Sequence, residues 1–284
     1  MIKGGVAVVI RFKKIYALFI AAAVVAASFS VGTIARLAVY AGSEKEYELP
    51  IVMYHQLTKK PQRAGRYVLT LEQFEKDLIY LRNAGYKSIT LTELLDFYDG
   101  KGTLPDKPVM ITFDDGNETL LEYALPLLEK YGFTAIGFVI GSSTDTYTKQ
   151  DDHNLNYSNL NWPEVRQICE GGVIDIQSHT YDLHKNTSSR SGAEFLSADA
   201  AKMKEAMLKN AGKEPCAVAY PFGSFSKCTA RIMKDCGMRA AFTCEERVNA
   251  IKKSEPEKLF GLGRYNRPNG ISSESFFKKM GIVS

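Results

Sequence analysis

Two adjacent aspartates are the first residues in this sequence whose types and placement suggest chemistry. Asp114 and Asp115 belong to the run TFDDG at 112–116, which ends an apolar stretch at 109–113 that we expect to be a buried strand. Two carboxylates at the end of a buried strand are costly unless they are paired or bound to a metal. A helix cap would account for one aspartate but not for both. The turn at Gly116 can bring both to one opening, so the pair is a candidate catalytic or metal-binding site.

Histidines follow a second strand-like run in the same relative place. His179 and His184, two of the four histidines in the chain, come just after the run at 173–177. One carboxylate and two imidazoles form a facial ligand set that leaves positions open for water and substrate. His55 follows another short apolar run, at 51–54. Because the carboxyl ends of strands converge on one face of a barrel, we expect these residues to meet there.

The elements that position these residues alternate between strand-like and helix-like segments. Such repeated β-then-α units predict a parallel sheet, open or closed, with helices outside it. The expected strands are 51–54, 87–89, 109–113, 134–140, 173–177, 216–220 and 239–243, and the expected helices are 70–84, 92–98, 118–131, 162–170, 197–210, 226–236 and 273–280.

Two long polar segments, 141–161 and 185–196, interrupt this alternation. Structureless loops of such length are uncommon in compact domains and are often functional. We therefore expect them to be loops that border the site, with Tyr147 and Tyr157 available to stack on a ligand.

The first 42 residues contain five basic residues and no acidic one. Within them, residues 15–35 form an uncharged apolar stretch of 21 residues, long enough to span a bilayer as a helix. The preceding basic residues favour a cytoplasmic amino end. We expect a cytoplasmic basic flank and transmembrane signal-anchor at 1–42, a charged spacer at 43–49, and an extracellular folded domain at 50–284. The alternative is a signal peptide cleaved near the small residues at 39–41.

Charge and composition exclude several classes of protein. The net charge is +4, but residues 43–284 carry 31 basic and 32 acidic residues, which disfavours a nucleic-acid partner. The chain is 45% apolar and 24% charged, as expected of a folded domain. Its five cysteines include no CxxC pair, so no disulfide framework or structural zinc site is indicated. We expect buried free cysteines, with one or two bridges as the alternative.

Two motifs together resemble those of a known family. TFDDG at 112–116 and SHTYDLH at 178–184 are similar to motifs of the polysaccharide deacetylases, also called the NodB-homology domain or carbohydrate esterase family four. The resemblance spans residues 50 to about 270. It implies an α/β fold, a single distorted (β/α) barrel of about seven units, here preceded by the predicted transmembrane helix. It also implies metal-dependent removal of N-acetyl groups from amino-sugar polymers.

The resemblance assigns roles residue by residue. Asp115, His179 and His184 match the metal ligands, and Asp114 matches the catalytic base. The two histidines are five residues apart rather than the usual four, which resembles the branch containing poly-N-acetylglucosamine deacetylases of biofilm matrices. In that branch an early histidine is the general acid, which implies this role for His55.

Other departures leave alternatives open. His153, in the polar segment, is the remaining candidate for the acid. Ala219 stands where the family's third motif has an arginine that braces the base, and Arg264 is a candidate for taking over that contact. Tyr220 and Phe222 lie in the turn YPFG at 220–223, which we expect to serve the oxyanion or the substrate.

The expected reaction is amide hydrolysis. A divalent metal, for which Zn²⁺ is favoured over Co²⁺ or another ion, lowers the pKa of water from about 16 towards about 7. Asp114 takes the proton from the water, a backbone N–H near Phe222 stabilises the oxyanion, and His55 protonates the leaving amine. Because protonated ligands would not bind metal, we expect activity to be lost below about pH 5.

The sequence leaves the substrate and two other functions open. The polymer could be poly-N-acetylglucosamine, peptidoglycan or a chitin-like oligomer, and the predicted anchor favours a surface or cell-wall polymer. An O-acetyl polysaccharide esterase would use the same ligands. A catalytically degenerate, membrane-tethered glycan-binding module is the non-enzyme alternative, motivated by Ala219. A zinc metalloprotease is disfavoured because HExxH does not occur in the sequence.

Overall fold

The computed structural model describes residues 44–185, 192–224 and 226–283. The predicted transmembrane segment at 15–35 and the cleavage site at 39–41 lie outside the described residues. None of the helices in the described part of the chain is long and apolar enough to cross a membrane. Residues Glu46–Ser284 form one compact unit.

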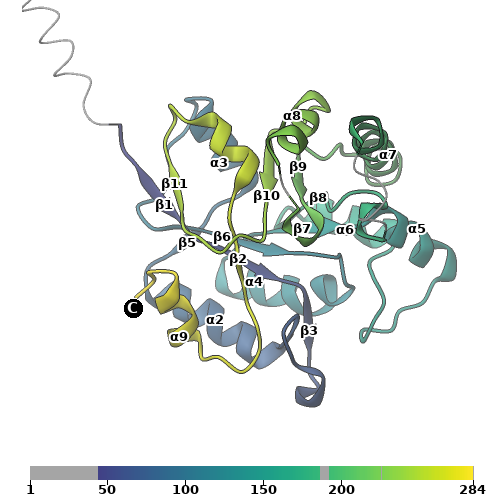
Figure 1. Cartoon of the computed structure of the whole chain (residues 1–284). Coiled ribbons are helices and arrows are strands. Elements are labelled where there is room, and N and C mark those ends of the chain that lie inside the picture. The colour runs from purple at the N-terminus through teal and green to yellow at the C-terminus, as the bar shows by residue number, and fades with distance from the viewer. Residues whose placement is uncertain (1–43, 186–191, 225, 284) are drawn as a thin grey trace, which may run out of the picture. The chain divides into compact units, whose positions relative to one another are not determined.

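A curled sheet of parallel strands lies at the centre of this unit (Figure 1). The strand order is β10-β9-β8-β7-β6-β2-β12, and β5 pairs with the beginning of β6. Neighbouring strands pair in parallel throughout this sheet. The strands are β2 (Ile51–Tyr54), β5 (Lys87–Ser88), β6 (Pro108–Phe113), β7 (Ala135–Val139), β8 (Ile174–Ser178), β9 (Ala217–Ala219), β10 (Ala240–Phe242) and β12 (Tyr265–Asn266). The predicted parallel α/β class is therefore confirmed.

The two edges of the curled sheet are linked by the segment that precedes β12. Leu262 donates its N–H to the carbonyl of Ala241 at 2.9 Å and accepts the N–H of Thr243 at 2.8 Å. These bonds make a parallel bridge between Phe242 of β10 and Leu262. Because β10 and β12 are the two ends of the strand order, the chain crosses from one edge to the other at this point.

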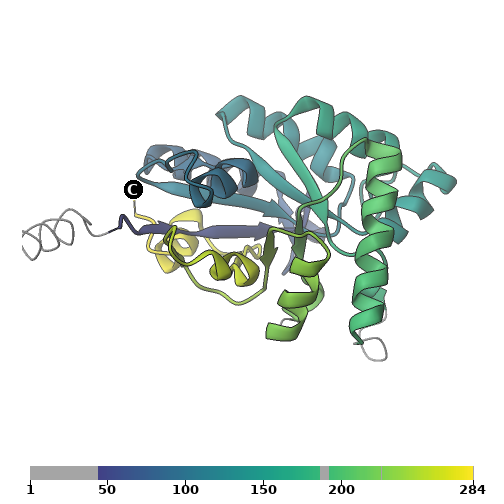
Figure 2. The ribbon, with the colours of Figure 1, turned by 90° about the horizontal axis from the view of Figure 1, so that it is seen from above.

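Helices cover the sheet, as the view from above shows (Figure 2). They are α2 (Leu71–Asn83), α3 (Leu91–Tyr98), α4 (Leu125–Tyr131), α5 (Gly141–Gln150), α6 (Trp162–Gly171), α7 (Ala193–Ala211), α8 (Lys227–Asp235) and α9 (Ser273–Lys279). A π-helical turn, Leu120–Ala124, precedes α4. Several helices begin where capping residues predict: Thr70 caps α2, and Thr90 and Asn161 form capping boxes with Glu93 and Glu164.

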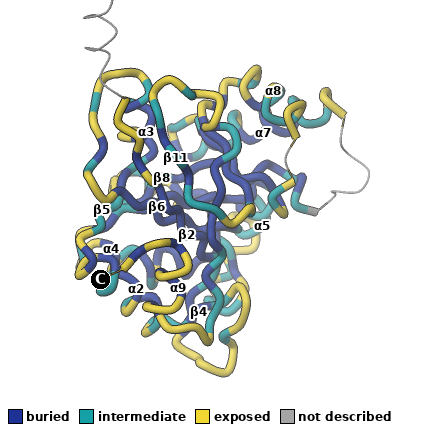
Figure 3. Tube along the Cα trace, turned by 60° about the vertical axis from the view of Figure 1, so that its left-hand side comes forward, coloured by how far each residue is buried: buried dark blue, intermediate teal, exposed yellow. Residues whose placement is uncertain are grey.

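Both faces of the sheet are buried (Figure 3). Along β6, Val109 and Ile111 pack into a core with α2, α6, α7 and α9, whereas Met110 packs into a second core with α3. Side chains of a strand alternate between its two faces, so continuous apolar runs are what a sheet buried on both sides requires. The same alternation places Thr112 and Asp114 on the face of Met110.

The polar segment 141–161 is not a structureless loop, contrary to our expectation. Its first half is α5, which follows β7 directly. Hydroxyls that normally compete with helix formation are satisfied within the helix, since Thr146 and Thr148 donate to the carbonyls of Ser142 and Thr144. The second polar segment is also shorter than expected, because α7 begins at Ala193.

Short strands outside the main sheet were not predicted from the sequence. β1 (Tyr47–Leu49) pairs with β11 (Asn249–Ile251), so the end of the predicted spacer 43–49 belongs to the folded unit. β3 (Gln56–Thr58) pairs with β4 (Val68–Thr70). Runs of three residues are too short to show a period. The five cysteines are free, as expected, but they are not buried: Cys228 is exposed and the others are partly exposed.

Candidate metal centre and neighbouring residues

Asp115, His179 and His184 converge beyond the carboxyl ends of β6 and β8. Oδ1 of Asp115 lies 3.4 Å from Nε2 of His179 and 3.3 Å from Nε2 of His184. One ligand atom from each of the three lies within 4.8 Å of the others. The structure therefore brings together the three residues that the family resemblance assigned to the metal.

The backbone after each strand turns sharply to achieve this. Asp115 and Gly116 have φ values of 68° and 67°, and Thr180, directly after His179, has a φ of 69°. Left-handed conformations are uncommon for residues other than glycine and concentrate at functional sites. A Cβ on Gly116 would lie 2.8 Å from Cγ1 of Val139, so this turn needs glycine for space as well as for φ.

The orientation of His179 fits a metal ligand. Its Nδ1 lies 2.9 Å from the carbonyl oxygen of Ala219, an acceptor that requires the proton on Nδ1. Nε2 faces Asp115, and its lone pair becomes available to a metal when this nitrogen gives up its proton. A hydrogen bond from the imidazole nitrogen that does not bind the metal fixes the tautomer of metal-bound histidines. The three residues thus present a carboxylate oxygen and imidazole nitrogens, a donor set that suits a divalent transition metal.

Asp114 forms a bidentate ion pair with Arg264. The two guanidinium nitrogens of Arg264 donate to Oδ1 and Oδ2 of Asp114 at 2.6 and 2.7 Å. Asp114 is 3% exposed and Arg264 is fully buried. The structure thus places Arg264 where the sequence analysis suggested, on the carboxylate next to the metal ligand.

Arg264 is itself held on several sides. Its Nε donates to the carbonyl of Thr243 at 3.0 Å, and one of its terminal nitrogens donates to Oγ1 of Thr112 at 3.2 Å. The guanidinium carbon lies 5.5 and 5.9 Å from the ring centroids of Phe138 and Phe242. These contacts fix the plane of the guanidinium, and with it the orientation of the Asp114 carboxylate.

The charges of these residues depend on one another. Burial opposes ionisation of Asp114, but the positive charge of Arg264 outweighs it and holds the pKa at about 2. Burial also opposes ionisation of Asp115, yet its hydrogen bond and ion pair with His179 keep its pKa below the ordinary value. Burial disfavours the charged form of His179, whereas Asp115 raises its pKa above the ordinary value. Both aspartates are therefore ionised at neutral pH.

His55 belongs to the same electrostatic site. Burial lowers the pKa of His55, and the negative charges of Asp114 and Asp115 partly oppose this effect. Its Nδ1 is buried and has no hydrogen-bond partner among the residues that the structure describes, and the centroid of its ring lies 4.8 Å from that of Tyr67. His153, the other histidine that the sequence left as a candidate acid, instead lies 2.6 Å from Glu118.

The turn after β9 separates the two residues that we expected to act together. Phe222 is 67% exposed, has a φ of 56°, and places its ring 4.8 Å from the ring of His184. Tyr220 is only 2% exposed, and its side chain packs with Met233 and Met238, so its predicted part in binding the oxyanion or the substrate stays a prediction and does not rest on an exposed side chain. The alternation of a buried strand turns this side chain into the core.

Two contacts in this site, made by Thr112 and Thr243, were not predicted from the sequence. Thr112 lies two residues before Asp114, and the period of a strand could have placed both on one face. The carbonyl of Thr243, which accepts from Arg264, carries no signal in the sequence because any residue supplies a carbonyl. Tyr147 and Tyr157 are the two tyrosines that we expected to be available to stack on a ligand. Tyr157 is 55% exposed, and the hydroxyl of Tyr147 donates to the carbonyl of Tyr157 at 3.2 Å.

These features define an α/β protein with a candidate metal centre at the strand ends and a second, arginine-bound carboxylate beside it. The model of the polysaccharide deacetylase family matches residues 101–241, which include Asp114, Asp115, His179 and His184. Together with the curated relatives, this shows that the chain belongs to the polysaccharide deacetylase family.

Curated relatives carry a more specific name. The chain is 31% identical over 205 residues to the poly-beta-1,6-N-acetyl-D-glucosamine N-deacetylase of Staphylococcus epidermidis, which covers 70% of this chain and 69% of the relative. It is also 31% identical over 189 residues to the protein of the same name from Staphylococcus aureus, covering 64% of this chain. That match spans 63% of the length of the S. aureus relative.

Solved structures share the fold. The deacetylase PplD of Streptococcus pyogenes, solved in complex with acetate, superposes with a TM-score of 0.70 at 20% identity, covering 83% of this chain and 99% of PplD. IcaB from Ammonifex degensii superposes with a TM-score of 0.66 at 25% identity, covering 78% of this chain and 93% of IcaB.

Proposed function

We propose that this protein is a metal-dependent hydrolase that removes N-acetyl groups from an N-acetylglucosamine-containing surface or cell-wall polysaccharide. The observation that carries the proposal is the convergence of Asp115, His179 and His184 beside an Arg264-bound Asp114. The names of the staphylococcal relatives support the class of substrate.

Asp115, His179 and His184 would hold the metal, and the mixed carboxylate and imidazole donors favour Zn²⁺. Such an ion, when bound, would polarise the amide carbonyl and lower the pKa of water, so that hydroxide is available to attack the carbonyl carbon. Asp114 is not needed as a ligand, and it remains ionised at neutral pH. It accepts the proton of the attacking water, and Arg264 keeps its carboxylate oriented while it does so.

The remaining steps need a donor to the oxyanion and a proton for the amine. Phe222 lies in the first turn of the short 3-10 helix Pro221–Gly223, where no carbonyl of the same helix accepts its N–H. We assign this N–H to the developing oxyanion. His55 gives a proton to the nitrogen as the C–N bond breaks, which releases acetate and leaves a free amine. Its lowered pKa makes its protonated form a stronger acid.

The structure bears on the non-enzyme alternative. That reading rested on Ala219, where the family's third motif usually has an arginine. Arg264 makes a bidentate contact with Asp114 from the segment just before β12, and the carbonyl of Ala219 accepts a hydrogen bond from His179. The bidentate contact of Arg264 with Asp114 supports an active site over a degenerate one.

The test measures acetate release from four substrates in parallel: β-1,6-linked N-acetylglucosamine oligomers, peptidoglycan fragments, chitin oligomers and O-acetylated xylan oligomers. We expect release from the first, loss of activity on chelation, and recovery with Zn²⁺ or Co²⁺. Asp114→Asn should lower the rate of acetate release. Its matched control is Asp235→Asn, at a largely exposed aspartate. Release from the xylan oligomers alone would instead indicate the esterase, and metal binding without any release would indicate a binding module.

Two further proposals concern the whole chain. We infer that the curled sheet is the distorted (β/α) barrel of the family, supported by the Leu262 link between its edges. We also propose that residues 15–35 anchor the protein in the cell membrane with the catalytic domain outside, supported by 21 uncharged residues behind a basic flank. Fractionation of cells, with protease added to intact cells, tests the second proposal. Protein that stays in the soluble cytoplasmic fraction would contradict it.

A further inference from the structure

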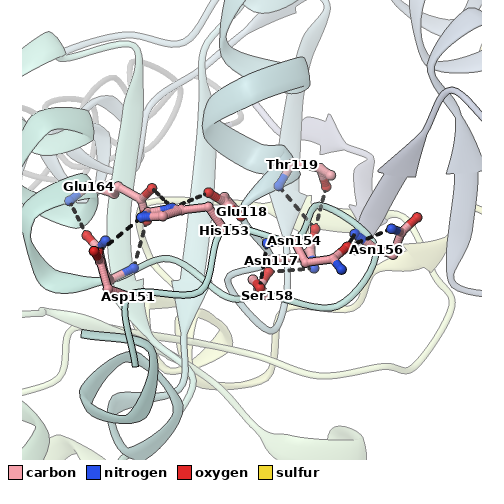
Figure 4. A network of polar contacts seen from close by, with 10 residues as sticks. Asn117, Glu118, Thr119, Asp151, His153, Asn154, Asn156, Ser158 and Glu164 are labelled. Atoms are coloured by element: carbon pink, nitrogen blue, oxygen red, sulfur yellow. Dashed lines mark hydrogen bonds and ion pairs between the residues drawn. The ribbon is translucent and has the colours of Figure 1, made fainter. Parts of the chain in front are cut away.

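A second group of side chains of the types that can bind a metal lies outside the catalytic residues (Figure 4). Nδ1 of His153 is 2.6 Å from Oε1 of Glu118 and 3.3 Å from Oε1 of Glu164. One ligand atom from each of these three residues lies within 4.8 Å of the others. On the other side of the imidazole ring, Nε2 lies 3.2 Å from Oδ1 of Asp151.

Negative charge exceeds positive charge in this cluster. Three carboxylates, Glu118, Asp151 and Glu164, surround one imidazole. Within the part of the chain that the structure describes, none of the three forms an ion pair with a lysine or an arginine. A buried carboxylate that lacks a strong cationic partner is expensive, because burial removes it from water.

Glu118 supplies a second, independent observation. The residue is 4% exposed, and its Oε2 is buried without a hydrogen-bond partner in the described structure. An unsatisfied oxygen on a buried carboxylate needs an explanation in a folded protein. A cation next to Glu118 would satisfy that oxygen directly.

We propose that Glu118, His153 and Glu164 form a second divalent-metal site, of the kind that binds Zn²⁺. In this arrangement Nδ1 of His153 and an oxygen from each glutamate are the ligands. Nε2–H of His153 donates to Asp151, which is the carboxylate–histidine pairing that orients metal-bound imidazoles. The imidazole ligand favours a transition metal over Mg²⁺ or Ca²⁺, which bind oxygen ligands.

The three ligands come from separate segments that the ion would join. Glu118 follows the turn that carries Asp115, His153 lies in the segment after α5, and Glu164 is in the first turn of α6. The segment after α5 also touches the catalytic turn, because Nδ2 of Asn159 donates to the carbonyl of Asp115 at 2.8 Å. An ion here would therefore pin the segment that supports the backbone of a catalytic metal ligand.

A protonated His153 is the competing arrangement. Hydrogen bonds from Glu118 and Asp151 raise the pKa of His153 to about 9, so without metal its imidazole is charged at neutral pH and pairs with both carboxylates. Bound metal would replace the proton at Nδ1 and add a second positive charge. The two arrangements differ in metal content, which makes them experimentally distinct.

Glu164→Gln is a sharp test because it preserves the helix cap. Oε2 of Glu164 accepts the N–H of Asn161 at 2.8 Å in a capping box, and glutamine can make the same bond. The full chain, purified in detergent, is loaded with Zn²⁺, freed of excess metal and analysed for zinc. We expect about two equivalents in the wild type and about one in Glu164→Gln, in His153→Gln and in Asp115→Asn. Asp115→Asn combined with Glu164→Gln should retain almost none.

Thermal unfolding gives a readout that is independent of activity. Zn²⁺ should raise the melting temperature of Asp115→Asn by about 5 °C and leave that of the double variant unchanged. Glu170→Gln, at an exposed glutamate of the same helix, is the control and should behave as the wild type. One equivalent in the wild type that Glu164→Gln does not reduce would overturn the proposal in favour of the protonated ion pair. A second equivalent that Glu164→Gln retains but thiol blocking removes would also overturn it, since that zinc would sit on cysteine.

Discussion

Arg264→Met is the perturbation that most directly tests how this site holds its charges. The substitution removes a guanidinium that donates to both oxygens of Asp114 at 2.6 and 2.7 Å. Methionine keeps much of the volume between the rings of Phe138 and Phe242 but cannot pair with the carboxylate. Asp115, His179 and His184 are untouched, so the metal content should not change.

The size of the effect follows from the pKa of Asp114. Burial raises that pKa, yet it is about 2 rather than the ordinary 3.8, a difference of about 2 units. At 1.36 kcal/mol per pKa unit, the charged carboxylate contributes about 2–3 kcal/mol of folding free energy. Because the folded pKa lies below the unfolded one, this stability is present above about pH 4 and is lost as the pH falls through about 2.

Without Arg264, burial dominates, and the pKa of Asp114 should rise from about 2 to above about 5, the pH below which the metal ligands become protonated. The free energy of unfolding at neutral pH should fall by about 3–5 kcal/mol, the usual cost of stranding one partner of a buried ion pair. The acid limb of the pH–rate profile should shift to higher pH, and kcat should fall about 10²-fold because the base is no longer oriented.

The assay compares pH–rate profiles of acetate release and denaturant unfolding curves. Arg267→Met is the matched control, because Arg267 is also buried and pairs with Asp77 at 2.8 and 3.0 Å. Both variants should lose similar stability, but only Arg264→Met should shift the acid limb. If the acid limb of Arg264→Met coincides with those of the wild type and Arg267→Met, then Arg264 does not keep Asp114 charged and our reasoning is wrong.

Three further outcomes are expected. Asp114→Asn should retain one equivalent of metal at the catalytic centre and lose about 10²–10⁴ in kcat, the scale of a general base, and an active variant would exclude Asp114 from that role. Chelation should abolish acetate release, and metal content measured against pH should fall below about pH 5 as the histidine ligands are protonated, so full occupancy at pH 4 would contradict the ligand set. Phe222→Ala should leave metal content unchanged and raise KM, because the exposed ring beside His184 offers a surface for a sugar, and an unchanged KM would show that the ring does not contact substrate.

The candidate base and one candidate metal ligand could be predicted from the sequence because they lie next to each other in one short motif. The motif TFDDG contains a strand end, a base, a metal ligand and the glycine of the turn, all within five residues. Strand alternation and positive φ values at Asp115 and Gly116 are consequences of that short sequence and its neighbours. The parallel sheet was predictable for a similar reason, since apolar runs and helix caps repeat along the chain.

Elements without a periodic pattern could not be predicted in this way. α5 is rich in serine and threonine, and its helical form depends on hydroxyls bonding to carbonyls of its own helix. Tyr220 looked accessible in the YPFG turn, but only the packing of α8 and β10 around it shows that it is buried. In both cases the deciding contacts are not encoded in the period of the sequence.

The sequence by itself determined the fold class, the two aspartates and the two histidines, because each depends on residues near one another in the chain. Tertiary structure decided which distant residues complete the site. Arg264 contacts Asp114 although the two residues are 150 positions apart in the sequence. Ala219, at the position where the family's third motif has an arginine, contributes only its carbonyl to the site. Glu118 likewise meets His153 across 35 positions. Pairings of this kind depend on how the sheet curls and how its loops pack, and those are properties of the whole folded chain.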